Sequence, residues 1–477
     1  MKKYLGYLLA LVLSITVLLA FTACGDGDAP AAQETPAAVT EAPAAATPTP
    51  APTATDEGGD YVTITYAMWG DAAEVANVQS VIDIFHSEQD RIRVEIINID
   101  RGEYVAALNT MAIAGNLPDS GIVVESMVIP WAEAGILADV SNMFDGFPEA
   151  PLSKLGFNWQ GNTVAYSVAN ELLLIFYNRD MFDDAGVAYP PASAATAWTW
   201  DQFVYTAQTL TLDGNGNNAH SPDFNPANIV QYGASFDAAI WMLEVWALSN
   251  GGGWFAPGNP NELIIDQAAA TEAIQMIADL HLVHNASPQF GTNTATTIES
   301  QLLTNTAMQV NGQWSIGVWL GPAQFSDGLN YGVGVLPTMQ RNVTIATGGA
   351  NVAFNTSPHL EEALEWLAWY AQVENALEGM IQTGIWMPIF PIWYHDEAYM
   401  RVWADNPNFP PFEEYRSAVI EYALTNAEPT AWYWVSNMEQ FTDVLATALA
   451  PVWSGQATAQ DAIDGAMNAL RAANQGQ

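Results

Sequence analysis

Hydrophobic positions change their spacing along the chain at regular intervals from residue 61 onward. In residues 61–68 (YVTITYAM) and 91–99 (RIRVEIINI), apolar and polar side chains alternate, which predicts two β-strands. Residues 73–87 and 103–115 have the spacing of helices, and residues 117–126 form a third predicted strand. The order strand, helix, strand, helix, strand favours a parallel sheet with crossover helices.

The same alternation continues to the C-terminus. Further strands are predicted over residues 163–169, 172–178, 305–311, 331–337 and 351–355. Further helices are predicted over residues 199–210, 270–283, 359–377 and 458–474, the first capped by Thr199. Since 477 residues exceed what one hydrophobic core usually serves, we expect a mixed α/β fold in two lobes.

The N-terminal 60 residues have no such pattern. Residues 1–24 combine Lys2 and Lys3 with an apolar run and end at the single cysteine, Cys24, which is typical of a secretory signal peptide; an N-terminal membrane anchor is the alternative. The FTAC tetrapeptide resembles a bacterial lipobox, in which Cys24 would be the lipid attachment site. Residues 25–60, rich in Pro, Ala and Thr, predict a disordered tether. We therefore expect a lipoprotein on the outer face of a bacterial cell membrane.

The charge balance argues against two classes of partner. With 52 acidic and 11 basic residues, the chain has a net charge of −41, which would repel nucleic acid and anionic membrane surfaces. Such an acidic composition fits a saline exterior or a habit of the lineage. One cysteine allows no disulfide within the chain.

Motifs for catalysis, cofactors and metals are not found. The pair His281 and His284 has no HExxH or cysteine cluster beside it, and DGNGNN (213–218) lacks the glycine and the final acid of a calcium loop. There is no GxSxG, no GxxxxGK[ST] and no GxGxxG after a strand. We expect a protein without metal or cofactor that is not an enzyme.

Aromatic content and strand ends point to a binding site. The chain has 18 Trp, 17 Tyr and 18 Phe, and tryptophan rings stack well on the apolar faces of sugars. Ligands of parallel α/β sheets collect at the carboxyl ends of strands. This rule selects Trp69 and Asp71 after the first predicted strand, and Glu125 and Ser126 after the third.

Five segments, in this order, carry a family likeness. They are NTMAIAGNLPDSGIV (109–123), WAEAGILADVS (131–141), LLLIFYNRDMFDDAGVAYPP (172–191) followed by TWDQF, NTAMQVNGQWSIG (305–317) and GGANVAFNTSP (348–358). From residue 61 to the C-terminus the chain resembles the extracellular solute-binding proteins of ABC importers, in the sugar-binding group that includes maltose-binding protein. The resemblance implies a two-lobed type II periplasmic-binding-protein fold with the ligand in a cleft between lobes.

The resemblance also implies individual site residues. Glu171 matches a ligand-bonding glutamate, and Trp241 and Trp254 match aromatic residues of the cleft. Trp314 matches a sugar-stacking tryptophan; it follows Gly312, which we expect in a turn, and the alternative is a core residue that anchors the next helix. Ser126 stands where maltose-binding protein has a bonding aspartate, which argues against maltodextrin itself.

Position adds Asn351, which follows two glycines, and Trp386, which follows the long predicted helix. By analogy, lobe 1 is expected to comprise residues 61–170 and about 341–380, and lobe 2 residues 171–340 and about 381–477. The expected function is a monomeric, membrane-tethered receptor that closes by hinge bending on a neutral sugar or oligosaccharide and delivers it to ABC permease subunits. Two alternatives remain: a secreted carbohydrate-active enzyme using Glu171, and the same fold binding a cation such as a polyamine.

Overall fold

The computed structural model describes residues 61–236, 239–292, 297–407 and 409–476, all within one unit that spans residues 56–477. The predicted signal peptide, the lipid attachment site Cys24 and the tether lie outside the described residues. Within the described part, no helix has both the length and the apolar character needed to cross a bilayer.

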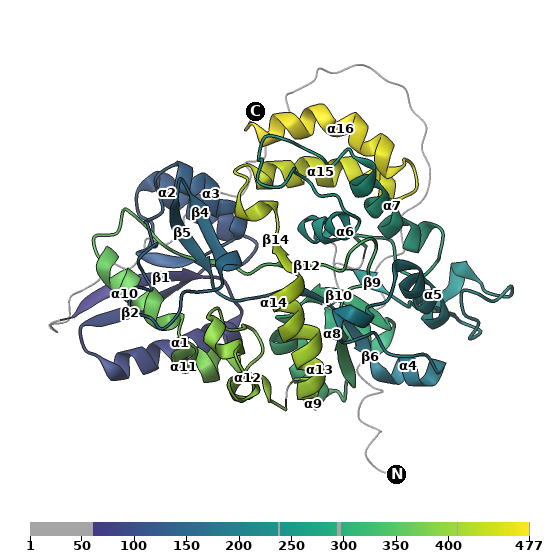
Figure 1. The fold of residues 1–477 in the computed structure, drawn as a ribbon, viewed down its shortest axis with the longest axis horizontal. Coiled ribbons are helices and arrows are strands. Elements are labelled where there is room, and N and C mark those ends of the chain that lie inside the picture. Colours follow the sequence, from purple (N-terminus) through teal and green to yellow (C-terminus); the bar gives the residue numbers. More distant parts are fainter. Residues whose placement is uncertain (1–60, 237–238, 293–296, 408, 477) are drawn as a thin grey trace, which may run out of the picture. The chain divides into compact units, whose positions relative to one another are not determined.

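A six-stranded sheet contains the three strands predicted first. Its strand order is β2-β1-β3-β13-β5-β4, and strands β1, β2, β4 and β5 are labelled in Figure 1. Its strands are β1 (Val62–Met68), β2 (Ile92–Asn98), β3 (Ser120–Val123), β4 (Gly156–Trp159), β5 (Asn162–Ser167) and β13 (Ala350–Ala353). Strand β1 pairs in parallel with both β2 and β3, as predicted, and the intervening helices are α1 (Ala72–Glu88) and α2 (Tyr104–Ala114). Strand β13 returns from a distant part of the chain and pairs antiparallel with β3 and β5.

Local sequence signals explain where α1 and α2 begin and end. Asp71 caps α1, since its carboxylate accepts hydrogen bonds from the backbone N–H groups of Ala73 and Glu74. Helix α2 ends at Gly115, which has a left-handed φ of 71° that glycine adopts without strain. Helix α3 (Glu125–Glu133) begins almost directly after β3.

A four-stranded sheet has the order β11-β6-β10-β9. Its strands are β6 (Leu173–Asn178), β9 (Ser235–Phe236), β10 (Met308–Gly312) and β11 (Tyr331–Gly334). Every residue of β6 is buried, which explains its continuous apolar run, and it pairs antiparallel with β10 and β11. The accompanying helices are α4 (Arg179–Ala185), α5 (Trp200–Leu210), α6 (Glu244–Ser249), α7 (Ala268–Leu282), α8 (Ile298–Thr304) and α9 (Gly321–Ser326).

The long helix predicted over residues 359–377 is interrupted. Helix α10 (Leu360–Tyr370) ends before Gln372, whose extended backbone separates it from α11 (Val373–Ala376) and the π-helical turn Leu377–Ile381. The side chain of Asn375 donates a hydrogen bond to the carbonyl of Trp369 across the break. Helix α10 packs on the six-stranded sheet, and α11 packs on α1.

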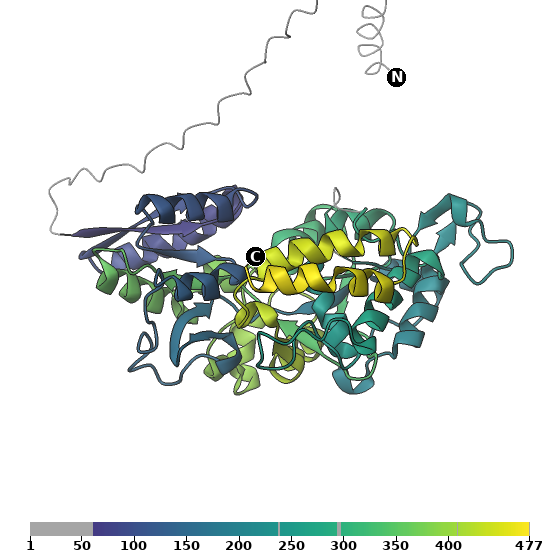
Figure 2. The same cartoon turned by 90° about the horizontal axis from the view of Figure 1, so that it is seen from above.

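The remaining helices complete the C-terminal part. They are α12 (Glu397–Ala404), α13 (Phe412–Tyr415), α14 (Tyr422–Asn426), α15 (Met438–Trp453) and α16 (Ala459–Asn474). Helices α15 and α16 lie side by side (Figure 2), and both pack on α7. A short parallel pair, β12 (Thr344–Ala346) with β14 (Ala427–Pro429), joins the chain before β13 to the chain after α14.

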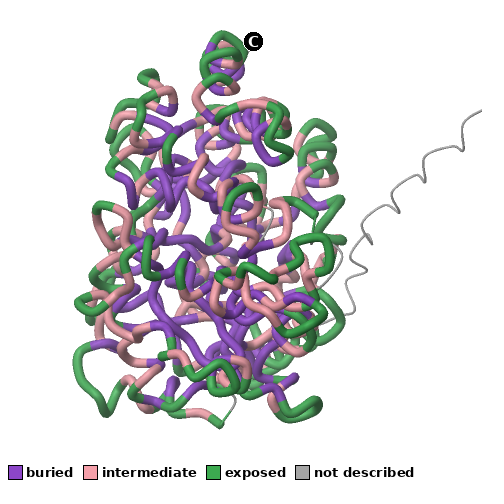
Figure 3. The backbone as a smooth tube through the Cα atoms, turned by 90° about the vertical axis from the view of Figure 1, so that its right-hand side faces the viewer, coloured by how far each residue is buried: buried purple, intermediate pink, exposed green. Residues whose placement is uncertain are grey.

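The two sheets define the two lobes of the fold. We refer to the six-stranded sheet with α1, α2, α3, α10 and α11 as the first lobe, and to the four-stranded sheet with α4–α9, α15 and α16 as the second lobe. Buried backbone, coloured purple in Figure 3, runs through the interior, and exposed segments are concentrated at the periphery.

Candidate functional site

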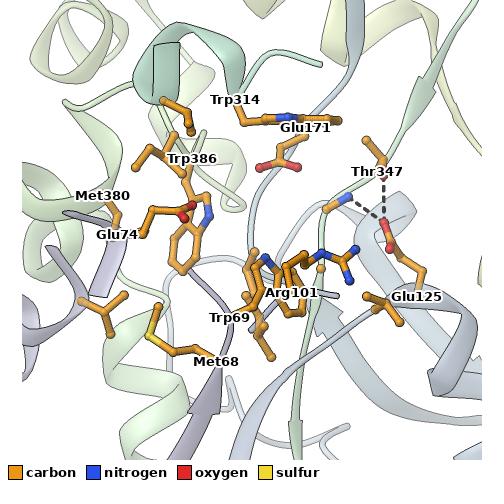
Figure 4. A pocket seen from close by; sticks show the side chains of 18 of the residues that line it. Met68, Trp69, Glu74, Arg101, Glu125, Glu171, Trp314, Thr347, Met380 and Trp386 are labelled. Carbon is orange, nitrogen blue, oxygen red and sulfur yellow. Dashed lines mark hydrogen bonds between the residues drawn. The ribbon is translucent and has the colours of Figure 1, made fainter. Parts of the chain in front are cut away.

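A cavity of about 240 Å³ is lined by residues of both lobes. This volume is close to the lower end of the roughly 300–1,000 Å³ typical of small-molecule sites. Four tryptophans from well-separated parts of the sequence line it: Trp69, Trp241, Trp314 and Trp386. Trp69, Trp314 and Trp386 are labelled in Figure 4. The sequence predicted all four as ligand-binding residues.

Three parallel strands deliver side chains to one edge of the cavity. Trp69 directly follows β1, Arg101 lies three residues after β2, and Glu125 lies two residues after β3. Since the carboxyl ends of parallel strands meet at one edge of a sheet, these residues converge although they are far apart in sequence.

The ring of Trp69 is held from several sides. It makes an edge-to-face contact with Tyr104, with the ring centroids 5.0 Å apart, and the guanidinium carbon of Arg101 lies 4.6 Å from its centroid. At Gly349 a Cβ atom would stand 2.9 Å from Cη2 of Trp69, so the ring occupies the space of the missing side chain. The contacts with Tyr104 and Arg101, together with the space left at Gly349, fix the orientation of the Trp69 ring in the cavity wall.

Trp314 uses a glycine in the same way. A Cβ atom at Gly312 would lie 2.0–2.2 Å from three ring carbons of Trp314, so no larger residue fits beneath the indole. The expectation of a turn at Gly312 is wrong: this residue is the last of β10 and pairs with Leu173 in the sheet. Trp241 stands beside Trp314, with centroids 6.3 Å apart and 30° between the ring planes.

Glu171 is the most buried acid of the cavity. Its backbone forms a β-bridge with Thr347, and the residue is 8% exposed. Among the described residues no group donates a hydrogen bond to its carboxyl group, which faces the cavity close to Trp314 (Figure 4). Burial, and then the charges of Glu125 and Glu74, raise the pKa of this carboxyl well above its usual value.

The two other acids of the cavity are tied to protein donors. Glu125 Oε1 accepts hydrogen bonds from Thr347 Oγ1 (2.8 Å) and from the backbone N–H of Gly348 (3.0 Å), both drawn in Figure 4. Glu74 accepts a hydrogen bond from the backbone N–H of Asp71 (2.9 Å), and its pKa is raised, mainly by burial. Of these three acids, Glu171 is therefore the one whose carboxyl group has no hydrogen-bond donor among the described residues.

Arg101 is the one cation among the residues that line this cavity. Apart from its stacking on Trp69, its guanidinium makes no hydrogen bond or ion pair with the described residues. Its donors are available to a ligand in the same cavity as the free carboxyl group of Glu171.

Trp386 reaches the cavity because of the packing that follows α11. A Cβ atom at Gly379, in the π-helical turn, would lie 2.8 Å from Val81 of α1, which allows this turn to sit directly on α1. The chain then places Met380, Ile385 and Trp386 in the cavity wall, where Trp386 meets the ring of Tyr370 at a centroid distance of 5.4 Å.

Two residues predicted at strand ends do not line the cavity. Asp71 is exposed and serves as the cap of α1. Ser126 is 2% exposed and is not among the residues that line the cavity; its hydroxyl donates a hydrogen bond to the carboxylate of Glu439. The strand-end rule gives the right edge of the sheet, but it does not say which of two neighbouring side chains points inward.

Two other predicted residues are buried and do not line the cavity. Asn351 in β13 is buried, and its amide oxygen accepts a hydrogen bond from the hydroxyl of Tyr66 (2.8 Å), so it orients a residue that does line the cavity. Trp254 is 1% exposed and belongs to the hydrophobic core of the second lobe. It is not among the residues that line the cavity.

Several cavity residues were not predicted. Arg101 follows the second strand, so the rule that selected Trp69 and Glu125 applies to it as well. Glu74, Thr347 and Tyr370 have no local signal, because they reach the cavity only through the packing of α1, α10 and the loop before β13.

Among the described residues no cluster of His, Cys, Asp and Glu suits a metal ion. In the DGNGNN loop, the carboxylate of Asp213 accepts hydrogen bonds from the backbone N–H groups of Asn215, Asn217 and Asn225.

Solved structures similar to this chain share its fold. An ABC substrate-binding protein from Listeria monocytogenes, in complex with cycloalternan, superposes with a TM-score of 0.72 and 19% identity over 87% of this chain and 100% of its own. MalE3 of T. maritima with maltose bound superposes with a TM-score of 0.67 and 20% identity, over 86% of this chain and 99% of its own. The sugar-binding protein MalE of Xanthomonas citri superposes with a TM-score of 0.69 and 14% identity, over 87% of this chain and 98% of its own. The α/β architecture is thus the type II periplasmic-binding-protein fold predicted from the sequence.

The family model for bacterial extracellular solute-binding proteins matches residues 80–411. This match covers more than half of the chain and includes elements of both lobes, from α1 to the residues just before α13. The chain therefore belongs to the bacterial extracellular solute-binding protein family.

Proposed function

We propose that this protein is the substrate-binding lipoprotein of an ABC transporter, and that it binds a neutral sugar or oligosaccharide for import. The observation that carries the proposal is the pairing of two free groups in one aromatic cavity. Glu171 offers an acceptor without a protein donor, and Arg101 offers donors without a protein acceptor.

A sugar hydroxyl suits both groups, because it donates one hydrogen bond and accepts others. A carboxylic acid ligand could pair with Arg101 but would lie beside a second acid, Glu171. An ammonium ligand could pair with Glu171 but would lie beside a second cation, Arg101. A neutral polyol has neither conflict. Since groups left unpaired in a closed cavity cost free energy, this complementarity selects for hydroxyl-rich ligands.

The tryptophans supply the apolar part of the recognition. Trp69 belongs to the first lobe, Trp241 and Trp314 belong to the second, and Trp386 follows α11. Rings from both lobes would cover the C–H faces of a sugar only when the lobes are close together, so ligand favours the closed form. The proposed site comprises Trp69, Glu125, Glu171, Trp241, Trp314 and Trp386, with Arg101 added from the structure.

The proposal keeps the predicted organisation of the chain. A lipid on Cys24 and a tether over residues 25–60 would hold a monomer at the outer face of the membrane, and the lobes would divide at about residues 170, 340 and 380. Permease subunits would receive the ligand, no bond in the ligand would be broken, and no cofactor would be needed. The ligands in two of the similar structures, cycloalternan and maltose, are saccharides, which supports this class of ligand without identifying the sugar.

A second candidate ligand is a cation such as a polyamine. The observation in its favour is that three carboxyl groups, Glu74, Glu125 and Glu171, line a cavity with one guanidinium and several aromatic rings. Cation–π contacts and carboxylates are the usual means of binding organic ammonium groups.

A thermal-shift screen of the full chain tests both candidates. Neutral mono- and oligosaccharides and polyamines would be added separately, and a ligand at 100 times its Kd stabilises the folded state by about 2.7 kcal/mol. We expect stabilisation by at least one neutral saccharide that is recovered intact afterwards. Stabilisation by polyamines alone would replace the sugar proposal, and a chemically altered saccharide would reveal an enzyme.

A further inference from the structure

Helix α3 is fastened at both ends to a distant segment of the chain. At its N-terminal end, the hydroxyl of Ser126 donates a hydrogen bond to the carboxylate of Glu439, in the first turn of α15. At its C-terminal end, the carboxylate of Glu133 accepts a hydrogen bond of 2.6 Å from the hydroxyl of Ser436. The residue before Ser126 is Glu125, which lines the cavity.

The segment that makes these contacts also packs on the first lobe. The ring of Tyr433 stacks on Phe157 of β4, with centroids 4.1 Å apart and 7° between the planes. Tyr433 is buried, and the turn Ala431–Tyr433 packs along α3. We call residues 430–439 the strap.

The other attachments of the strap are to the second lobe. Helix α15, which the strap enters, packs on α16 and α7. The backbone N–H of Ala431 donates a hydrogen bond of 3.2 Å to the carboxyl group of Glu244, which is 3% exposed. Glu244 directly follows the 3₁₀ turn Ile240–Leu243, which contains the cavity residue Trp241.

We propose that the strap couples the two walls of the cavity, and that the hydrogen bond between Ser126 and Glu439 is a latch that holds α3, and with it Glu125, at its present distance from the second lobe. Ser126 and Glu439 are positioning residues in this scheme: neither lines the cavity. The inference rests on the two-lobed closure of the proposed function, but not on the identity of the ligand.

The exposure of the two partners explains why this contact suits a latch. Glu439 is exposed, so its carboxylate is hydrated as soon as the bond opens, whereas Ser126 is buried against the strap. The partners are 313 residues apart in sequence, and the bond therefore joins elements that local structure does not hold together. Its loss leaves the secondary structure of α3 and α15 intact and changes only how α3 is held.

The test measures the separation of the lobes without any ligand. Spin labels would be placed on cysteines introduced at Ile113 of α2 and Phe325 of α9, both exposed, in the full chain with Cys24→Ser. The distance distribution between the labels would be compared in the parent, Ser126→Ala and Glu439→Ala. We expect both variants to gain a population at longer distance, and the double variant to gain no more than either single one.

Two controls separate the latch from a general effect of charge or folding. Asp443→Ala removes an exposed carboxylate from the same helix one turn later and should leave the distribution unchanged. Glu439→Gln keeps an acceptor oxygen and should restore the short distance. Identical distributions in the parent, Ser126→Ala and Glu439→Ala would overturn the latch, and equal changes in Asp443→Ala would do so too. Failure of the sugar screen would leave these distances unaffected, so the two proposals fail separately.

Discussion

The indole of Trp314 rests on the backbone of Gly312, and this contact separates its role from that of Trp254. Trp314 is half-buried at the cavity, whereas Trp254 is buried in the core. Trp314→Ala should abolish stabilisation by the ligand and lower the free energy of unfolding by about 1–2 kcal/mol, less than the roughly 3–5 kcal/mol of a fully buried tryptophan. Trp254→Ala is the matched control and should lose the larger amount while its folded fraction still binds. Chemical denaturation measures the loss of unfolding free energy in each variant, and ligand titration measures binding. A larger loss in Trp314→Ala than in Trp254→Ala would mean that Trp314 is a core residue.

Gly312→Ala tests the same ring without removing it. The added methyl group would overlap ring carbons at 2.0–2.2 Å, so the indole must move away from its position at the cavity. We expect weaker ligand binding, as measured by calorimetry, with all tryptophans present. Gly465→Ala, at a helical glycine in α16 with open space around a new Cβ atom, is the control and should bind normally. Unchanged affinity in Gly312→Ala would show that the ligand does not use this ring.

Glu171 predicts a pH dependence of stability. Burial, together with Glu125 and Glu74, raises the pKa of the folded state above the usual 4.5 of the unfolded chain, so the folded protein holds the proton more tightly. The contribution of this group is fully present below pH 4.5 and is lost as the pH rises through the folded pKa. The stability of Glu171→Gln relative to the parent should therefore increase from pH 5 to pH 8, as measured by urea unfolding. A stability difference between Glu171→Gln and the parent that stays flat from pH 5 to pH 8 would contradict the assignment.

At the scale of elements, helix ends follow local chemistry. Thr199 Oγ1 accepts a hydrogen bond from the backbone N–H of Gln202, and the Gln202 side chain accepts one from the backbone N–H of Thr199, a reciprocal cap for α5. Thr199→Ala should cost about 1 kcal/mol, and Thr199→Ser should restore most of it. Thermal unfolding measures the cost. Since α5 does not line the cavity, affinity should stay the same in both variants, and a loss of affinity would mean that α5 supports the site.

The break after α10 shows where local chemistry stops being sufficient. Residues 359–377 contain no glycine or proline, so periodicity predicted one helix. The chain instead leaves the helix at Gln372 and settles α11 and Gly379 against α1. This contact between distant elements places Trp386 in the cavity. The spacing of apolar residues within 359–377 does not indicate the contact. The cap at Thr199 and the first three strands were predictable because their causes are local, and this break was not.

At the scale of the whole molecule, the sequence predicted the topology better than the site. The parallel pairing of β1 with β2 and β3 followed from alternating periodicities, and the strand-end rule selected the edge of that sheet that lines the cavity. Which side chains face inward depends on packing, as Ser126 and Glu125 demonstrate: adjacent residues on α3, one bonded to Glu439 and one in the cavity wall. Trp254 illustrates the limit of carrying residues over from a resemblance, since an aromatic position of the family is filled here by a core residue.

The net charge of −41 predicts how stability depends on salt. With 52 acidic and only 11 basic residues, most carboxylates have no cationic partner, so repulsion among them opposes the folded state. Raising the salt concentration from 0.1 M to 1 M shortens the screening length from about 10 Å to about 3 Å and should weaken this repulsion. Most of the ion pairs, such as Arg91 with Glu365, are exposed, so little stabilisation is lost by screening them. The melting temperature should therefore rise with sodium chloride.

The unliganded protein is the right sample for this measurement, because ligand binding would add its own salt dependence. Trp314→Ala should show the same increase as the parent, since the effect arises from the whole surface and not from the cavity. Trimethylamine N-oxide stabilises by exclusion and does not screen charge, so it separates general stabilisation from electrostatics. A melting temperature that stays constant or falls with sodium chloride would mean that the carboxylates are far enough apart for water alone to screen them, and that the acidic composition has another cause.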